Sequence, residues 1–473
     1  MRNTTKVLAL VGVGLLPLEV GCNDPLRVSI PDIVQPGQLS GADALPTVRA
    51  GVLGDFSIAY TGDHPDGSGG TEGVIMYGGL LADEWINSET FPTRIEVDAR
   101  TIQTTNADVD LWFRRMHQAR NSAEKAAAQF AQFAPTDPGY AEMLTLAGLT
   151  YIFFAETWCS GVPVSHLNAD GSIAYGQPLT TLATLDTAIA RFDQAIAVST
   201  DPAMTYFATV AKARAVLDTG GFAAAGALAA TVPTSFVYVQ EHSENTDRQN
   251  NGVFNANTSD GRYALADLEG GPGGQNGFPF RSVADPRTTW ITPIDDNGDT
   301  IPGFDNSTVL WTEQRYGSRR APITVATGVE ARLIEAEAAL QAGNDAEFLA
   351  QLNEPRANPG ERAYFDPTPF TPSDTTTRPI GVLPNLTALD EIAAGGGVNL
   401  LFAERARWLW LTAHRLGDLR RLIRQYGRAA DTVFPTGPYF KVNFADYGTD
   451  VNFPIPITEK QNPNFTACLD RNP

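Results

Sequence analysis

Pairs of alanine-rich helical patterns constrain the fold of this chain more than any other feature of its sequence. The first pair combines apolar and small residues at three- and four-residue spacing: Leu144, Ala147, Gly148 and Tyr151, then Ala188, Phe192 and Ala195. Small residues at this spacing let two antiparallel helices approach closely, and an aromatic ring fills the groove between them. These two segments are therefore predicted to form one packed helix pair.

Two further pairs follow in order along the chain. The second consists of Phe207, Val210, Ala211 and Arg214 with Ala223, Ala227, Ala230 and Pro233, and the third of residues 331–342 with residues 345–352. The spacing is similar to that of tetratricopeptide repeats, in which each helix pair buries its apolar face against the next. The sequence thus predicts a helical-repeat scaffold over about 140–233 and 327–352.

The remaining segments are predicted to combine helices with long loops. Helices are expected at 40–60, 73–86, 108–133 and about 401–426. A long irregular insert, 235–324, is rich in glycine, asparagine and aspartate and separates the second and third helix pairs. Loops of this length inside a folded protein usually carry function. The 43 glycines and 32 prolines argue against a simple helical bundle.

The N-terminal residues have the pattern of an export signal. Arg2 and Lys6 precede a short apolar stretch, residues 7–18, which is too short to span a bilayer. Cys22 follows Gly21 and resembles the lipidated cysteine of bacterial lipoproteins, although Glu19 stands where an aliphatic residue is expected. Residues 1–21 are therefore predicted to be a signal peptide, with lipidation at Cys22 and a tether over 22–39. The alternative is ordinary secretion with an incidental cysteine.

Two further cysteines remain after lipidation of Cys22. An even pair in an oxidising compartment is a candidate disulfide, so Cys159 and Cys468 are predicted partners. The alternative is two buried free thiols, because sequence alone does not bring two sulfur atoms together.

The charge of the chain limits its ligands. The formal net charge is −20 at pH 7, which argues against binding nucleic acid or adhering broadly to anionic lipid. An uncharged ligand or another protein is the better expectation.

Enzyme motifs are missing from the sequence. The chain has no His-Glu-x-x-His, no Gly-x-Ser-x-Gly and no phosphate-binding Gly-x-x-x-x-Gly-Lys pattern, and we expect neither catalysis nor a cofactor. The oxygen-rich run of Asp295, Asp296, Asn297 and Asp299 suggests calcium as one interpretation. It lacks the closing glutamate of a calcium loop, so solvated turn residues are the other interpretation.

The C-terminal part carries the most specific motifs. Residues 404–411 read Glu-Arg-Ala-Arg-Trp-Leu-Trp-Leu and lead through His414 and Arg415 to Asp418-Leu-Arg-Arg. Further motifs are found at 453–456, 459, 462–464, 82–84, 161–163 and 285–287. Together these resemble the RagB/SusD family of glycan-binding outer-membrane lipoproteins. The resemblance implies a mainly α SusD-like fold with embedded helix pairs and a loop-rich insert, as a single domain over 40–473 with the family's C-terminal motifs at 400–473.

The resemblance also implies a function. Such a protein would be anchored by lipid on the outer face of the outer membrane and would cover a TonB-dependent, SusC-like transporter. It would bind an oligosaccharide or a similar nutrient, and the helical-repeat region would face the transporter. Rival interpretations are capture of peptides by the same mechanism, a structural repeat adaptor without a small ligand, and a surface glycan hydrolase.

The resemblance further implies that the ligand binds on loops, which here are 61–72, 86–107 and 235–324. Exposed aromatic rings stack on sugars and amides bond their hydroxyls. By the resemblance the candidate residues are Trp85, Asn87, Trp290 and Trp311, with Tyr263 behind them. Each has a core-packing alternative.

The charged residues of the C-terminal motif are expected to be structural. Glu404, Arg405, Asp418 and Arg420 are predicted to form ion pairs that hold the fold, and Arg415 or Arg421 is the expected partner of Asp418.

Overall fold

The computed structural model describes residues 41–63, 70–168, 170–270, 276–357, 363–365, 377–441 and 444–473. The predicted signal peptide, Cys22 and the whole predicted tether, 22–39, lie outside the described residues. The helices are α1 Leu45–Thr61, α2 Val74–Ala82, α3 Pro92–Asp98, α4 Ala107–Phe133, α5 Pro138–Thr157, α6 Thr181–Val198, α7 Pro202–Asp218, α8 Phe222–Ala229, α9 Gly252–Phe254, α10 Gly328–Gln341, α11 Asp345–Ala357, α12 Ala388–Ala394, α13 Gly397–Trp408 and α14 Arg415–Arg424. The mainly α fold class is confirmed.

Short antiparallel strands connect the helices. The pairs are β1 Gly62–Asp63 with β2 Thr71–Glu72, β3 Trp85–Asn87 with β9 Tyr263–Leu265, β4 Val162–Pro163 with β7 Pro178–Leu179, β5 His166–Leu167 with β6 Ile173–Ala174, β8 Val237–Gln240 with β12 Ile323–Thr327, β10 Trp290–Ile291 with β11 Thr312–Glu313, and β13 Ala363–Phe365 with β14 Thr377–Pro379. Each pair is a two-stranded ribbon, so the helices carry the core.

Four helices begin at residues whose side chains cap the first helical turn. Asn106, Asp137, Thr180 and Asp201 cap α4, α5, α6 and α7, each accepting a hydrogen bond from a backbone N–H of the first turn. Such caps satisfy donors that have no partner within the helix, and proline in the first turn of α5 and α7 fits for the same reason.

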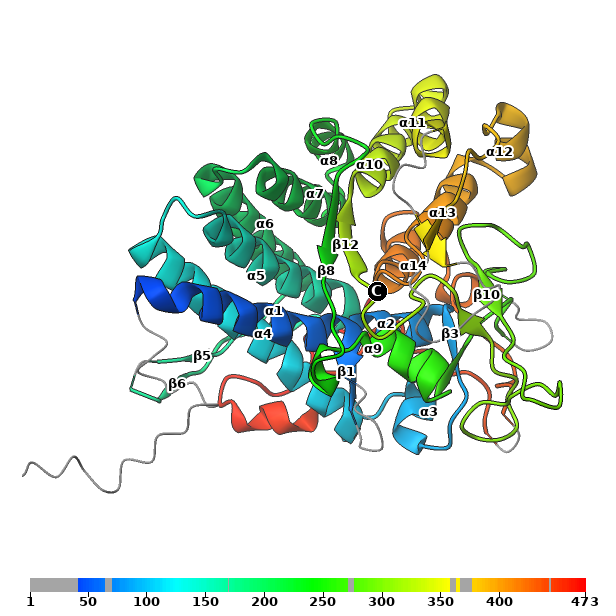
Figure 1. The fold of residues 1–473 in the computed structure, drawn as a ribbon, viewed down its shortest axis with the longest axis horizontal. Coiled ribbons are helices and arrows are strands. Elements are labelled where there is room, and N and C mark those ends of the chain that lie inside the picture. Colours follow the sequence, from blue (N-terminus) through cyan, green and yellow to red (C-terminus); the bar gives the residue numbers. More distant parts are fainter. Residues whose placement is uncertain are drawn as a thin grey trace, which may run out of the picture.

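The predicted helix pairs are present and pack in a row. Helices α5 and α6, α7 and α8, and α10 and α11 are packed pairs, and α8 packs on α10 (Figure 1). The close approach depends on small residues: a Cβ atom at Gly148 would lie 2.4 Å from the Phe192 ring, and one at Gly226 would lie 2.6 Å from the Cβ of Ala338. The row therefore continues across the insert.

Strands β8 and β12 explain how the insert interrupts the row without breaking it. They pair antiparallel, with Gln240 opposite Ile323 and Val237 opposite Thr327, so the chain leaves and re-enters the scaffold at one place. The loop-rich segment between them lies at the opposite side from the N-terminal repeat helices (Figure 1). The insert is thus free to build a separate surface.

The prediction of one continuous helix over about 401–426 is wrong. It is divided into α13 and α14 by a turn in which Leu411 and Ala413 have φ of 54° and 61°. The backbone groups of this turn bond to distant side chains. Leu411 N donates to Glu84 Oε1 at 2.9 Å. The Tyr316 hydroxyl donates to the Leu411 carbonyl at 2.9 Å, and the Tyr60 hydroxyl donates to the Thr412 carbonyl at 3.1 Å. Tertiary hydrogen bonds therefore outweigh the helical pattern.

The charged C-terminal residues are buried, as expected for a structural role, but two of their partners differ from the prediction. Arg405 pairs with Asp418 at 2.8 Å, and Glu404 pairs with arginines at 2.7 and 2.8 Å, those being Arg287 and Arg356. Of the two arginines expected beside Asp418, Arg421 pairs with it at 3.3 Å, whereas Arg415 pairs with Asp83. Arg420 donates to the carbonyl of Ala155 at 2.8 Å, so its expected ion pair is replaced by a backbone contact.

The C-terminal end is attached to the end of α5. Cys159 and Cys468 form a disulfide with an Sγ–Sγ distance of 2.10 Å, and Cys159 N donates to Phe453 O at 2.9 Å. Phe453 is fully buried among aromatic rings that include Trp112 and Trp158. Across the ranges given above, no helix combines the length and apolar character that a bilayer span requires.

Candidate ligand-binding cavity

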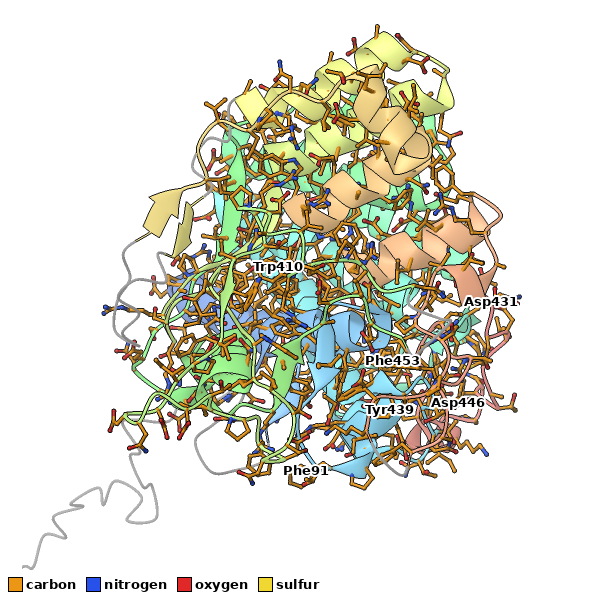
Figure 2. The ribbon with its side chains drawn as sticks, turned by 90° about the vertical axis from the view of Figure 1, so that its right-hand side faces the viewer. Phe91, Trp410, Asp431, Tyr439, Asp446 and Phe453 are labelled. Carbon is orange, nitrogen blue, oxygen red and sulfur yellow. A yellow bond between two sulfur atoms is a disulfide. The ribbon has the colours of Figure 1, made fainter. Side chains whose placement is uncertain are left out.

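A cavity of about 850 Å³ opens on the loop-rich side of the molecule. Its walls come from four parts of the chain: residues 86–95, residues 267–270 with Arg281, residues 305–311, and a C-terminal group of Phe440, Lys441, Phe444 and Tyr447. Figure 2 views this side, with Phe91 at its lower edge and Tyr439 and Asp446 in the C-terminal segment. The volume is in the range of ligand sites.

The alternation of side chains along strand β3 determines which of its residues face the cavity. Neighbouring side chains of a strand point to opposite faces, so Ile86 lines the cavity while Trp85 and Asn87 point to the core. Trp85 and Tyr263 are fully buried, and the Tyr263 hydroxyl donates to Glu72 Oε1 at 2.7 Å. Asn87 is also buried, and its Oδ1 accepts from Lys441 Nζ at 2.9 Å. Trp85, Asn87 and Tyr263 are therefore not among the ligand contacts that we propose.

Both tryptophans of the insert lie close to one arginine, Arg281. Trp311 lines the cavity, and the guanidinium carbon of Arg281 lies 3.6 Å from its ring centroid. The ring centroid of Trp290, in β10, lies 5.6 Å from the same carbon, and its indole nitrogen donates to the Arg281 carbonyl at 3.4 Å. Trp290 is thus a support for Arg281, and Trp311 remains a candidate contact.

The most exposed aromatics of the cavity come from a segment that the sequence analysis did not assign to the ligand side. Phe440 and Phe444 are 42% and 46% exposed. Both pack on Tyr439 beneath them, with ring centroids 4.7 and 5.8 Å away, and Tyr447 packs on the same ring at 5.1 Å. The sequence signal that could have identified this segment is its four aromatic residues between Gly437 and Gly448.

Lys441 attaches this segment to two other walls. Its ammonium donates to Asp305 Oδ2 and Asn87 Oδ1, both at 2.9 Å, and to the carbonyl of Glu89. Burial opposes ionisation of Asp305, but hydrogen bonds from Thr308, Lys441 and Ser307 outweigh it and lower the pKa of Asp305 to about 2. The charges of Lys441 and Asp305 are therefore compensated within the protein.

A buried carboxyl pair holds the same segment from below. Burial, then the neighbouring Asp98, raises the pKa of Glu269 far above its ordinary value, and burial raises the pKa of Asp98 to about 6. The two buried carboxyl groups are neighbours, and each affects the pKa of the other. Tyr447 donates to Glu269 at 3.0 Å and Tyr439 donates to Asp98 at 2.6 Å. Two tyrosines thus attach the segment to a buried carboxyl pair.

A second aromatic group, Phe91 and Phe304, adjoins the lining residues Thr90 and Asp305 in sequence. The guanidinium of Arg262 lies over the rings of Phe91 and Phe304, at 5.6 and 4.7 Å from their centroids. Arg262 also pairs with the buried Glu89 at 2.8 Å, and Arg94 pairs with the same carboxylate at 3.2 Å. Glu89 is therefore neutralised from two sides.

The arrangement suits binding rather than hydrolysis. Asp98 and Glu269 are buried neighbours that accept hydrogen bonds from Tyr439 and Tyr447, whereas a glycosidase places its two carboxyl groups roughly 5–9 Å apart on either side of the substrate. Asp83 is paired with Arg415, and Glu84 accepts from Leu411, both away from the cavity lining.

The acidic run suggested for calcium forms a turn. Asp295 Oδ1 accepts the backbone N–H groups of Asn297 and Asp299, both at 2.9 Å. Among the residues with described positions, no group of three His, Cys, Asp or Glu side chains is placed to hold a metal ion.

Comparison with solved structures matches nearly the whole chain. A SusD/RagB family protein from Bacteroides thetaiotaomicron is 13% identical with a TM-score of 0.61, over 88% of this chain and 94% of that chain. A SusD-like protein from Bacteroides fragilis is 13% identical with a TM-score of 0.61, over 94% and 100%. A laminarin-binding SusD-like protein is 14% identical with a TM-score of 0.56, over 91% and 99%. Neither a protein-family model nor a curated protein matches the sequence.

The resemblance inferred from the C-terminal motifs is confirmed at the level of the fold. Helix pairs, loop-rich insert and C-terminal helices follow one another in the predicted order. At these identities the comparison carries architecture and not individual binding residues. This chain has the SusD-like fold of the SusD/RagB proteins.

Proposed function

We propose that this protein binds an oligosaccharide in the cavity and delivers it to a TonB-dependent, SusC-like outer-membrane transporter. The observation that carries the proposal is the pair of exposed rings, Phe440 and Phe444, at the edge of a cavity of about 850 Å³. Exposed rings bordering a cavity are the arrangement that stacks on the apolar face of a pyranose. Binding of this kind requires no chemistry on the ligand.

Polar groups beside these rings would bond the sugar hydroxyls. Asp267 lies in the lining, and its Oδ1 accepts from the backbone nitrogens of Arg281 and Ser282 at 2.9 and 3.0 Å. Its carboxylate is thus held in place by the backbone while the side chain stays partly exposed. A fixed acceptor beside stacking rings supports recognition of a hydroxylated ligand.

The cellular setting of the proposal rests on the N-terminal pattern and on the fold. Lipidation at Cys22 would attach the chain to the outer membrane, facing the exterior. The row of helix pairs, with the insert on another side of the molecule, would leave the repeat surface for the transporter. One structural relative is described as laminarin-binding, which supports a glycan as the ligand class.

The proposal is tested on the mature chain from residue 23 with an array of oligosaccharides and peptides. On any oligosaccharide that binds, we expect Phe440→Ala and Phe444→Ala each to weaken affinity by about tenfold, because truncation removes the apolar ring area that the sugar face buries, worth on the order of 1.5 kcal/mol. Phe133→Ala is the matched control, since Phe133 is 39% exposed on α4 and lies outside the cavity lining.

The opposite results would reject the proposal. Binding of peptides alone would replace the oligosaccharide by a peptide nutrient. An array without any binding, together with retention of the transporter in a pulldown, would leave a structural adaptor as the better interpretation.

A further inference from the structure

Arg281 is the cavity residue whose charge the surrounding protein does not neutralise. Its guanidinium lies across Trp311 at 3.6 Å, and its Nε is buried without a hydrogen-bond partner. Throughout the described part of the chain, no residue forms a salt bridge or side-chain hydrogen bond with this guanidinium. Burial lowers the pKa of Arg281, and the negative charge of Asp267 opposes this shift.

The other charged groups of the lining are compensated. Glu89 is paired with Arg94 and Arg262, and Asp305 is bonded to Lys441 and to its own loop. Glu269 is buried beside Asp98, and burial raises its pKa, which disfavours its charged form. Asp267 Oδ1 accepts from two backbone nitrogens and from the Ser282 hydroxyl, so hydrogen bonds within the protein compensate this carboxylate.

The side chain of Arg281 is also held in one orientation. Its backbone nitrogen donates to Asp267 Oδ1 at 2.9 Å, its carbonyl accepts from Trp290 at 3.4 Å, and two indole rings contact its guanidinium. An arginine fixed by stacking presents its terminal nitrogens in a fork that matches both oxygens of a carboxylate. Little rotamer entropy then remains to be lost when an anion binds.

We infer that the ligand carries a carboxylate bound by Arg281, and that it is an oligosaccharide containing a uronic acid. This inference rests on the proposed function and narrows its ligand class. The net charge of −20 favours an uncharged ligand when the chain is considered as a whole. A ligand carboxylate bound in the cavity would lie nearer to the Arg281 guanidinium than to the acidic residues on the rest of the surface. Exposed charges beyond roughly 8 Å are screened at physiological salt.

The test uses titration calorimetry of the mature chain with an oligogalacturonate, its methyl ester, and a neutral laminari-oligosaccharide at 0.15 M salt. We expect the free acid to bind at least about tenfold more tightly than its ester, the effect of losing a charge-assisted hydrogen bond pair. Arg281→Met keeps an unbranched apolar side chain over Trp311 and should remove this preference. Arg281→Lys keeps the charge without the fork and should retain part of it.

Arg248→Gln is the control, because Arg248 is 63% exposed on its side chain and does not line this cavity. Equal affinity for the acid and its ester, or an undiminished preference in Arg281→Met, would overturn the inference. Binding of the neutral oligosaccharide alone, with loss in Phe440→Ala, would overturn it too and leave the proposed function intact. Failure of all three oligosaccharides to bind, with peptides bound, would overturn both.

Discussion

Asp98, at the end of α3, and Glu269, in the loop after β9, are buried carboxyl neighbours beside the cavity. Through Tyr439 and Tyr447 this pair also holds the segment that carries Phe440 and Phe444. The two tyrosine hydrogen bonds therefore connect the C-terminal part of the cavity wall to α3 and to the loop after β9.

The pair predicts that stability decreases as pH rises. Both folded-state pKa values are raised above the unfolded values, so the stabilisation is complete at a pH below the unfolded pKa values and is lost as the pH rises through about 6 for Asp98 and higher for Glu269. The positive charges of Lys441 and Arg100 favour the ionised carboxylates of the pair, and the negative charge of Asp83 disfavours them. These charges do not reverse the sign of the pH dependence. Thermal unfolding between pH 5 and 9 measures the slope.

Glu269→Gln should flatten this pH dependence, because the amide donates to Asp98 without a titrating proton and still accepts from Tyr447. Glu244→Gln, at an exposed position, is the control. An unchanged slope in Glu269→Gln would assign the pH dependence to other buried acids, among them Glu84 and Glu313, whose pKa values burial raises to about 8.

Asp83→Asn should strongly destabilise the protein. Asp83 and Arg415 form two hydrogen bonds of 2.6 Å, and both side chains are buried. Removing one charge leaves an uncompensated buried guanidinium, which costs about 3–5 kcal/mol of unfolding free energy. Urea unfolding at pH 7 measures the change.

The surface pair Lys212 and Asp193 provides the comparison, since the Asp193 side chain is 55% exposed. Asp193→Asn should change stability by less than about 1 kcal/mol. Similar losses in the two variants would argue against a special structural role for the Asp83–Arg415 pair.

Gly148→Ala should disturb the first helix pair. The added Cβ would lie 2.4 Å from the Phe192 ring, and the ring is buried between α5 and α6. Relieving this overlap requires the helices to separate or the ring to leave its rotamer, at about 1–3 kcal/mol. Gly51→Ala in α1 has open space and should instead stabilise by about 0.5–1 kcal/mol, so opposite shifts in melting temperature are expected.

Removal of the disulfide should lower stability without changing the fold. Cys159 and Cys468 are separated by 309 residues, and cross-linking such a distance restricts the unfolded chain. We expect the double variant Cys159→Ala, Cys468→Ala to lose about 2–4 kcal/mol. Labelling of the unfolded wild-type chain with a thiol reagent is the independent check: modification of either cysteine without reductant would contradict the bond.

Local patterns predicted the scaffold because the helix pairs depend on residues close in sequence. Gly148 and Tyr151 lie on one turn, and their spacing alone indicates which face packs on the next helix. The ligand-side insert was also recognisable, because a long loop rich in glycine and aspartate has little capacity to build its own core. Trp311 was identified from that insert and does line the cavity.

The sequence by itself thus determined the helix pairs, the place of the insert and the resemblance carried by the C-terminal motifs. Tertiary structure decided the break at Leu411, the inward orientation of Trp85 and the contribution of Phe440 and Phe444 to the cavity. The break depends on Glu84, far away along the chain, and the orientation of Trp85 depends on the pairing of β3 with β9. Such contacts join residues hundreds of positions apart, and their geometry is set only when the core packs.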